Sequence, residues 1–165
     1  TATLAMGDAL AVACLDAKGF KPEDFARSHP GGALGRRLLI HVNDVMRTGD
    51  DIPKVTVGVT VLEAVREITR KHIGMTSVID VNNRVVGIFT EGDLRRLIEK
   101  VGDIREIKIE DVMAQSPKVI SKNALATEAA HILNEALCNQ LLVTDAQGCL
   151  IGALHIQDLM TAKVL

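Results

Sequence analysis

The chain carries the same pattern twice. Two ten-residue segments, 85–94 (VVGIFTEGDL) and 150–159 (LIGALHIQDL), align without a gap. A shorter motif precedes each of them, NDVM at 43–46 and EDVM at 110–113. A repeat of roughly sixty-five residues indicates one supersecondary unit used twice, and such units bury their apolar faces against each other. The repeat therefore predicts two packed copies with ligand clefts between them.

Each copy has the residue pattern of a β-α-β-β-α unit. In the first copy, Thr60 and Glu63 have the spacing of a capping box ahead of an amphipathic helix that Gly74 ends. Asn82 and Asn83 are typical of a hairpin turn between two strands. The predicted strands are 55–57, 75–80, 84–89, 118–120, 141–144 and 149–154, and the predicted helices begin at 60, 90, 127 and 156. These elements predict an α+β fold of two pseudo-symmetric copies, in which helices cover one face of each small sheet.

Residues 1–41 lie outside the repeat. The stretch 3–17 is apolar almost all round, which predicts a helix that is buried on more than one side and ended by Gly19. Pro22 is typical of the first turn of another helix, and 28–37 is a glycine-rich loop. The first residue is not Met and no basic stretch of a signal peptide follows it, so we interpret this segment as the tail of a preceding domain. We divide the chain into 1–41, 42–100 and 101–165.

The composition argues against several classes of function. The net charge is −2, and the clustered bases Arg36-Arg37 and Arg95-Arg96 are too short to form a nucleic-acid surface. The chain has three Phe and no Trp or Tyr, so bases are not expected to stack on aromatic side chains. No apolar run reaches the roughly 18 residues that span a bilayer. We therefore expect no nucleic-acid partner and no membrane partner.

The cysteines indicate the compartment. Cys14, Cys138 and Cys149 are widely spaced and include no CxxC pair. This usage is typical of reduced, buried cysteines in a cytoplasmic protein, and a disulfide between Cys138 and Cys149 is the alternative. No metal site and no required cofactor are predicted.

The repeat resembles the CBS domain family, and the tandem pair resembles a Bateman module. The resemblance rests on an apolar strand ending in Asp80, a turn, a second strand with Gly87, and then Thr90-Glu91-Gly92-Asp93. The second copy keeps Gly152 and Asp158 in the matching places. Membership would imply that adenine or other nucleotides bind in clefts between the copies.

The resemblance also indicates which side chains meet a ligand. In the family the Thr hydroxyl meets phosphate and the Asp carboxylate meets ribose hydroxyls, and these roles fall on Thr90 and Asp93. A helix N-terminus suits an anion, and a carboxylate one turn later accepts from a diol. In the alternative interpretation, Thr90 and Asp93 are only an N-cap and a first-turn acid. Arg95 and Arg96 either reach phosphate or lie on a solvated helix face. Further candidates at the mouth of the same cleft are Met75, Thr76, Ser77, Asn139 and Gln140.

The second copy departs from this pattern. His155 stands in place of the Thr, whereas Asp158 is kept. A protonated His155 is able to meet phosphate, and a neutral one is able to cap the helix or pack against it. If a single cleft binds ligand, we expect it to be the one with Thr90 and Asp93.

The first forty residues resemble the end of a sugar isomerase (SIS) domain. The motif that carries the likeness is Ser28-His29-Pro30-Gly31-Gly32-Ala33-Leu34-Gly35, followed by Arg36-Arg37-Leu38-Leu39. The order of the parts is similar to that of the arabinose 5-phosphate isomerases, in which an SIS domain precedes a CBS pair. This resemblance implies a parent enzyme that interconverts D-ribulose 5-phosphate and D-arabinose 5-phosphate. Its product feeds Kdo, a sugar of lipopolysaccharide or capsule.

His29 matches a histidine that is implicated in catalysis in that family. The ordinary titration range of histidine suits proton transfer near neutral pH, and the alternative is that His29 only orders the glycine-rich loop. The family's phosphate-binding loop and its other catalytic groups are expected upstream of Thr1. We therefore predict that this fragment alone is inactive.

These observations lead to one hypothesis and two alternatives. The hypothesis is a regulatory CBS pair that binds a nucleotide, or a nucleotide-sugar such as CMP-Kdo, and biases its own SIS catalytic domain. One alternative is a ligand-free module that holds a homo-oligomer together through the aliphatic face of Ala129, Ile132, Leu133 and Leu137. The other is a free-standing nucleotide sensor, against which the motif at 28–35 argues.

Overall fold

The computed structural model describes residues 2–21, 24 and 39–165. It contains a four-stranded sheet with the order β1-β2-β3-β4 and a three-stranded sheet with the order β5-β6-β7. The elements up to the end of the first copy are α1 (Ala2–Ala17), α4 (Val42–Val45), η1 (Gly49–Asp51), β1 (Lys54–Thr56), α5 (Val61–Lys71), β2 (Met75–Ile79), β3 (Val85–Thr90) and α6 (Glu91–Val101). Those that follow are η2 (Ile109–Asp111), β4 (Ala114–Gln115), β5 (Val119–Ser121), α7 (Ala126–Glu135), β6 (Gln140–Thr144), β7 (Leu150–His155) and α8 (Ile156–Thr161).

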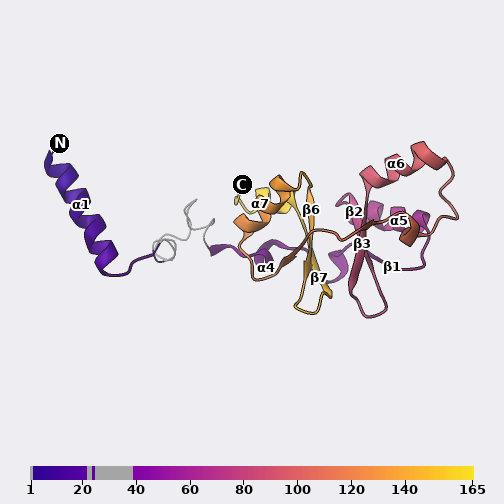
Figure 1. Cartoon of the computed structure of the whole chain (residues 1–165), viewed down its shortest axis with the longest axis horizontal. Coiled ribbons are helices and arrows are strands. Elements are labelled where there is room, and N and C mark those ends of the chain that lie inside the picture. The colour runs from indigo at the N-terminus through magenta and orange to yellow at the C-terminus, as the bar shows by residue number, and fades with distance from the viewer. Residues whose placement is uncertain (1, 22–23, 25–38) are drawn as a thin grey trace.

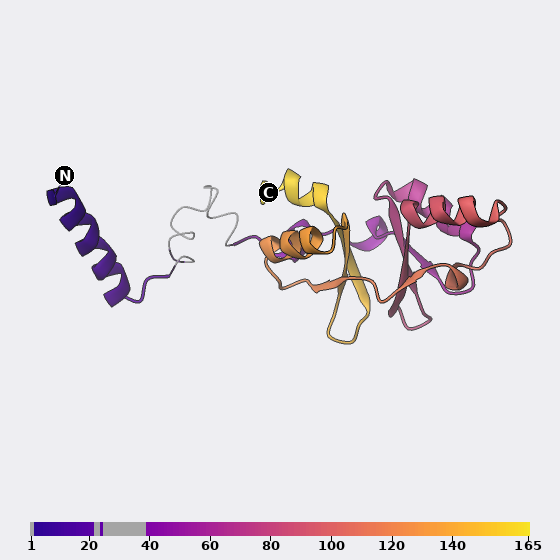
Figure 2. The ribbon, with the colours of Figure 1, turned by 45° about the horizontal axis from the view of Figure 1, so that its top comes forward.

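The two sheets lie next to each other in the middle of the pair. The long helices of each copy lie on its outer side, away from the other copy (Figures 1 and 2). Buried side chains from both copies form a cluster between the sheets, including Ile79 and Met75 from the first copy and Leu142 and Leu150 from the second. The predicted α+β fold of two pseudo-symmetric units is confirmed.

α1 forms close to its predicted range, but its predicted burial is wrong. None of its residues is buried, because no element in the described part of the chain covers it. Gly19 ends the helix as predicted: its φ is +61°, and its N–H donates to the carbonyl of Asp16 at 2.9 Å. The predictions for Pro22 and for the loop 28–37, His29 included, fall outside the described residues.

α5 begins at the predicted capping box and ends earlier than predicted. The backbone N–H of Thr60 donates to the Glu63 carboxylate at 2.7 Å, and the Glu63 N–H donates to the Thr60 hydroxyl at 3.3 Å. The helix ends at Lys71 instead of Gly74, because His72 takes the left-handed conformation with φ of 54°. Gly74, with φ of +71°, then turns the chain into β2.

The two hairpins share an irregularity, which supports the repeat. In the first copy β1 is parallel to β2 and β2 is antiparallel to β3, with a register shift between Val78 and Ile79. In the second copy β5, β6 and β7 repeat that arrangement, with the shift between Val143 and Thr144. Asn83 takes the predicted positive φ, at 61°, in the first hairpin turn. Both shifts fall at matching positions, so the copies are alike in detail.

The segment ahead of each copy packs on the other copy. Val42 lies in the core of the second copy, and its N–H donates to Ala124 at 2.9 Å. In the same way, Ile109 lies in the core of the first copy, and its N–H donates to Val59 at 3.0 Å. β4, which we did not predict, continues this exchange by pairing with β3. The two copies are therefore joined by reciprocal segments as well as by their facing sheets.

The aliphatic face of α7 packs against the core of the second copy. Ala129 and Leu133 are buried in the core of the second copy, and Ile132 packs against that core. Leu137 lies beyond the helix and is exposed. A face whose members already pack internally has little surface left for a second protein molecule, which weighs against the ligand-free alternative in its proposed form.

Candidate ligand-binding site

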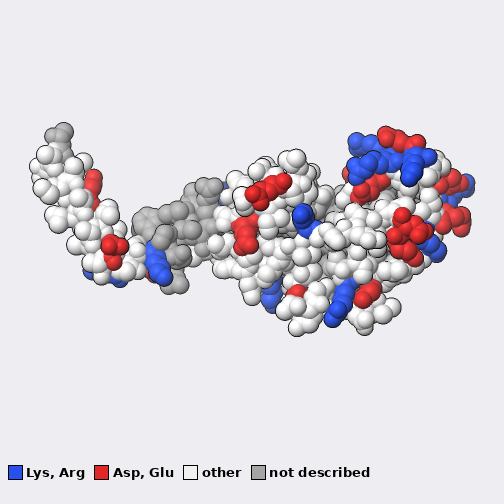
Figure 3. Space-filling view, viewed as in Figure 1, with Lys and Arg blue, Asp and Glu red and all other residues white. Residues whose placement is uncertain are grey.

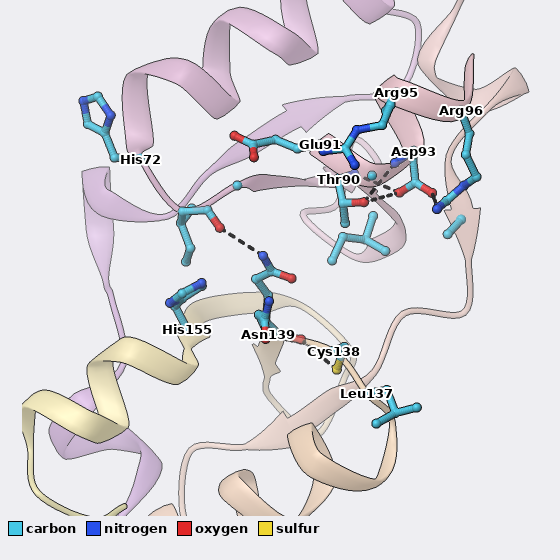
Figure 4. Close-up of a pocket in the computed structure, with 16 residues that line it drawn as sticks. His72, Thr90, Glu91, Asp93, Arg95, Arg96, Leu137, Cys138, Asn139 and His155 are labelled. Carbon is cyan, nitrogen blue, oxygen red and sulfur yellow. Dashed lines mark hydrogen bonds and ion pairs between the residues drawn. The ribbon is translucent and has the colours of Figure 1, made fainter. Parts of the chain in front are cut away.

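A cavity of about 810 Å³ lies between the two copies. Its volume falls in the range of small-molecule sites. The first copy supplies the turn after α5 and the start of α6, and the second copy supplies the segment before β6 and the end of β7 (Figure 4). The lining residues are His72, Ile73, Gly74, Ile88, Thr90, Glu91, Gly92, Asp93, Arg95, Arg96, Ala114, Leu137, Cys138, Asn139, Gln140 and His155.

Thr90 and Asp93 form a reciprocal cap at the start of α6. The Asp93 carboxylate accepts from the Thr90 N–H at 2.9 Å and from its hydroxyl at 2.7 Å, and the Asp93 N–H donates to that hydroxyl at 3.2 Å. The cap is present, as the alternative interpretation requires. Both residues also line the cavity, so capping and ligand binding are compatible.

Two arginines follow on the next turn of α6. The Arg96 guanidinium donates to the other oxygen of Asp93 at 2.6 Å, while 72% of its side chain is exposed. Arg95 also lines the cavity. Figure 3 shows blue side chains gathered over α6, with acidic ones beside them. A guanidinium pair beside a helix N-terminus favours a phosphate, and the neighbouring carboxylates favour hydroxyl groups.

The opposite wall comes from the second copy. Asn139 and His155 face α6 across the cavity in Figure 4. The Gln140 amide donates to the carbonyl of Ile73 at 3.2 Å, which ties this wall to the first copy. Polar groups from both copies therefore converge on one space, as the sequence predicted for Asn139 and Gln140.

Three predicted candidates lie elsewhere. Met75, Thr76 and Ser77 are fully buried in β2 and do not line the cavity. The Ser77 hydroxyl donates to the carbonyl of Pro53 at 2.7 Å. Both faces of β2 are covered, so its side chains belong to the core. Met75 packs in the cluster between the two sheets, and Val78 packs in the core of the first copy.

The second copy's Asp158 also lies away from the cavity. Its carboxylate accepts from the N–H of His155 at 2.8 Å and from the guanidinium of Arg47 twice, at 3.3 Å each. It lines a separate hollow of about 280 Å³ beside α4. His155 and Asp158, although they match Thr90 and Asp93, are therefore divided between two places.

His155 caps α8 in its neutral form. Its Nδ1 accepts from the N–H of Gln157 at 3.1 Å, which requires that nitrogen to be unprotonated. Burial lowers the pKa of His155 below its ordinary 6.5; Arg47 lowers the pKa further, and Asp158 acts in the opposite direction. The structure therefore favours the capping role that the sequence left open.

We expect His155 to titrate below pH 6.5 in the folded protein. Because its folded pKa lies below the unfolded value, the unfolded chain binds more protons between the two values, and stability falls as the pH drops through this window. Above pH 6.5 the contribution of His155 to stability is complete. NMR titration of the imidazole resonances tests this, with the same chain in denaturant as the control. A folded midpoint at or above the denatured one contradicts the assignment.

Sequence reasoning missed several residues of the site. His72, Gly74, Leu137 and Cys138 reach the cavity because they flank the strands that carry the predicted residues. Ala114 reaches it through β4, the strand that we did not predict. The signal that could have found Ala114 is the repeat itself, since this residue directly follows the EDVM motif at 110–113.

Two features are absent from the described residues. No helix there has both the length and the apolar character needed to cross a membrane. No group of three or more His, Cys, Asp or Glu side chains is gathered there around a place for a metal ion.

Comparison with known proteins identifies the class. The CBS domain profile matches residues 42–100 and 109–164, one match for each copy. The chain therefore belongs to the CBS domain family, and it holds a tandem pair of these domains.

Over its whole length, the chain is also similar to part of a sugar-phosphate isomerase. All 165 residues align with arabinose 5-phosphate isomerase KdsD, at 47% identity to the protein of Pseudomonas aeruginosa and 48% to that of Escherichia coli. The chain spans about half the length of these relatives, 51% and 50% respectively. The predicted resemblance to arabinose 5-phosphate isomerases is confirmed.

Solved structures share the paired fold. CBSX2 in complex with AMP is 28% identical, with a TM-score of 0.65 over 74% of this chain and 95% of that one. The CBS domain pair of protein MJ0100, in complex with 5′-methylthioadenosine and S-adenosyl-L-methionine, is 16% identical, with a TM-score of 0.66 over 73% of this chain and 93% of that one. The second likeness concerns the fold alone.

Proposed function

We propose that this chain is the regulatory CBS pair of an arabinose 5-phosphate isomerase and that it binds a phosphorylated nucleoside ligand in the cavity between its copies. The observation that carries the proposal is the convergence of Thr90, Asp93, Arg95 and Arg96 on one side of a cavity of about 810 Å³. The likeness of the whole chain to about half of KdsD supports the isomerase part, and the AMP complex of CBSX2 supports the nucleotide part.

The polar groups suit a ligand with both phosphate and hydroxyl groups. Arg95, Arg96 and the N-terminus of α6 favour phosphate, and the carboxylates of Glu91 and Asp93 accept from hydroxyls. A nucleotide-sugar such as CMP-Kdo has both kinds of group, and so has AMP. CMP-Kdo also lies downstream of the proposed isomerase product, so it is a reasonable feedback effector.

The proposal extends to the parent enzyme. The SIS catalytic domain interconverts D-ribulose 5-phosphate and D-arabinose 5-phosphate for Kdo and lipopolysaccharide synthesis in the cytoplasm, with His29 in its catalytic centre. The CBS pair biases that domain within a homo-oligomer. Regulation of this kind requires a ligand with different affinities for two states of the whole enzyme.

The direct test is ligand titration. AMP, ATP and CMP-Kdo are added to the full 165-residue chain, and the melting temperature and heat of binding are recorded. A ligand at 100 times its Kd stabilises the folded state by about 2.7 kcal/mol, so a rise of several degrees is expected. No rise with any of the three at millimolar concentration contradicts the nucleotide proposal.

The regulatory part needs the whole enzyme. The isomerase rate of the full-length protein is measured with and without the binding ligand, and again after deletion of residues 42–165. A ligand response that disappears with the pair supports regulation. A response that survives the deletion, or no response in either protein, overturns it.

A further inference from the structure

Arg47 and Ala114 occupy equivalent positions in the two copies. Each directly follows the repeated motif, as Asp44-Val45-Met46-Arg47 and Asp111-Val112-Met113-Ala114. Arg47 pairs across the sheet with Ala153, and Ala114 pairs with Ile88, which matches Ala153 in the repeat. The pseudo-symmetry therefore places one arginine and one alanine at the same structural position.

The methionines before them confirm this equivalence. A Cβ added to Gly152 would lie 2.6 Å from the Met46 sulfur, and one added to Gly87 would lie 2.8 Å from Cγ of Met113. Each methionine thus lies over the glycine of the strand that its segment joins. One residue later, Arg47 lies against Asp158, and Ala114 lines the cavity that Asp93 also lines.

The arginine binds the aspartate of its site. Nε and Nη2 of Arg47 donate to the two oxygens of Asp158, at 3.3 Å each, and Nη1 donates to the carbonyl of Lys71 at 3.2 Å. Only 28% of the Arg47 side chain and 20% of the Asp158 side chain are exposed. Asp158 therefore forms a partly buried, bidentate ion pair with Arg47.

Asp93 is as buried as Asp158, with 19% of its side chain exposed, but it lines the large cavity, which Asp158 does not. Ala114 is exposed, lines the cavity and has no atoms that reach Asp93. Asp93 is met by Thr90 and Arg96, which belong to its own helix cap and helix. Both aspartates therefore meet a guanidinium, but Arg96 is 72% exposed and lies on the same helix as Asp93, whereas Arg47 is 28% exposed and comes from the segment ahead of the first copy.

We propose that Arg47 is a built-in cation that occupies the second copy's carboxylate and restricts the pair to a single ligand site, the cavity beside Asp93. This inference rests on the proposed nucleotide function. It predicts that one AMP binds per chain, and that an arginine placed at the equivalent position in the first copy closes that site as well.

The test is the variant Ala114→Arg, assayed by calorimetry with AMP. The new guanidinium is expected to bind Asp93 and fill the cavity, and so to weaken AMP binding by at least about tenfold. Gln115→Arg is the matched control: it adds the same charge to the next residue of β4, whose side chain points to the other face of the sheet. The control should bind AMP within about threefold of the original chain.

The contact between Arg47 and Asp158 is tested without ligand. Arg47→Ala and Asp158→Asn are each expected to lower the melting temperature by about 3 °C, and the double variant by little more than either one. Additive single effects mean that the two side chains do not interact, which overturns the inference.

The two proposals fail in different ways. Two AMP molecules per chain, or undiminished binding by Ala114→Arg, overturns the role of Arg47 and leaves the nucleotide function standing. No AMP binding at all counts against the adenine nucleotide function. The role of Arg47 is then decided by the melting temperatures alone.

Discussion

Replacing both Arg95 and Arg96 with alanine is expected to weaken nucleotide binding about 100-fold, or about 2.7 kcal/mol. Both side chains line the cavity beside the N-terminus of α6, where a phosphate gains most from them. A hydrogen bond to a charged group contributes about 1.5–3 kcal/mol. Because Arg96 is exposed, we expect the two arginines together to contribute near the lower limit of the sum of two such bonds. Isothermal titration calorimetry with the ligand found by titration measures the change.

The control for this loss is a second pair of arginines. Arg66 and Arg70 lie on α5, outside the cavity, and their replacement changes the net charge by the same amount. The Arg66→Ala/Arg70→Ala variant should bind as the original chain does, apart from a small effect that salt screens. If both variants lose affinity equally, the effect is one of overall charge and the phosphate assignment of Arg95 and Arg96 is wrong.

Gly87→Ala is expected to lower the free energy of unfolding by about 3 kcal/mol. The new methyl group would overlap the Met113 side chain and would lie 3.1 Å from the Ala114 carbonyl oxygen. The backbone of β4 is held by pairing with β3, so it has little freedom to move away. Urea unfolding followed by circular dichroism gives the difference in free energy.

Gly92→Ala is the matched control for this variant. It makes the same chemical change in the same copy, but the nearest atom to the added methyl group is the Thr90 hydroxyl oxygen at 3.5 Å, an ordinary contact. Its unfolding free energy should stay within about 1 kcal/mol of the original value. Equal losses in the two variants contradict the close approach of Met113 to Gly87.

Most of the fold was predictable because the local signals and the repeat agreed. Thr60 with Glu63, and Thr90 with Asp93, mark helix starts by hydrogen bonds that involve neighbours only three residues apart. Asn83 marks a turn by its own conformational tolerance. Such signals need no knowledge of the rest of the chain, so the predicted helix starts and hairpins formed.

The features that the sequence did not predict have no signal in the local residues. α5 ends earlier than predicted because His72 takes a left-handed conformation, which its residue type does not require. β4 is two residues long and gains its place by pairing with a strand of the other copy. The predicted burial of α1 failed because an apolar sequence requires a covering surface, and none is among the described residues.

The candidate site was predictable in part for the same reason. The motif identified Thr90, Asp93, Arg95 and Arg96, and the repeat carried the search to Asn139 and Gln140. The separation of Asp158 from the cavity could not be seen without its partner, since Arg47 lies 111 residues away in the sequence. Knowledge of which residue follows each repeated motif would have pointed to that pair.

The exchange of segments between the copies also bears on how the protein is made. Val42 is synthesised well before the residues that bury it, such as Leu141 and Leu159. The first copy likewise waits for Ile109 before its core is complete. Domains generally fold as units during synthesis, the N-terminal one first. Here neither half is a complete unit, so the nascent chain carries unfinished apolar surface until translation of the pair ends, and that interval is when it most needs protection from aggregation.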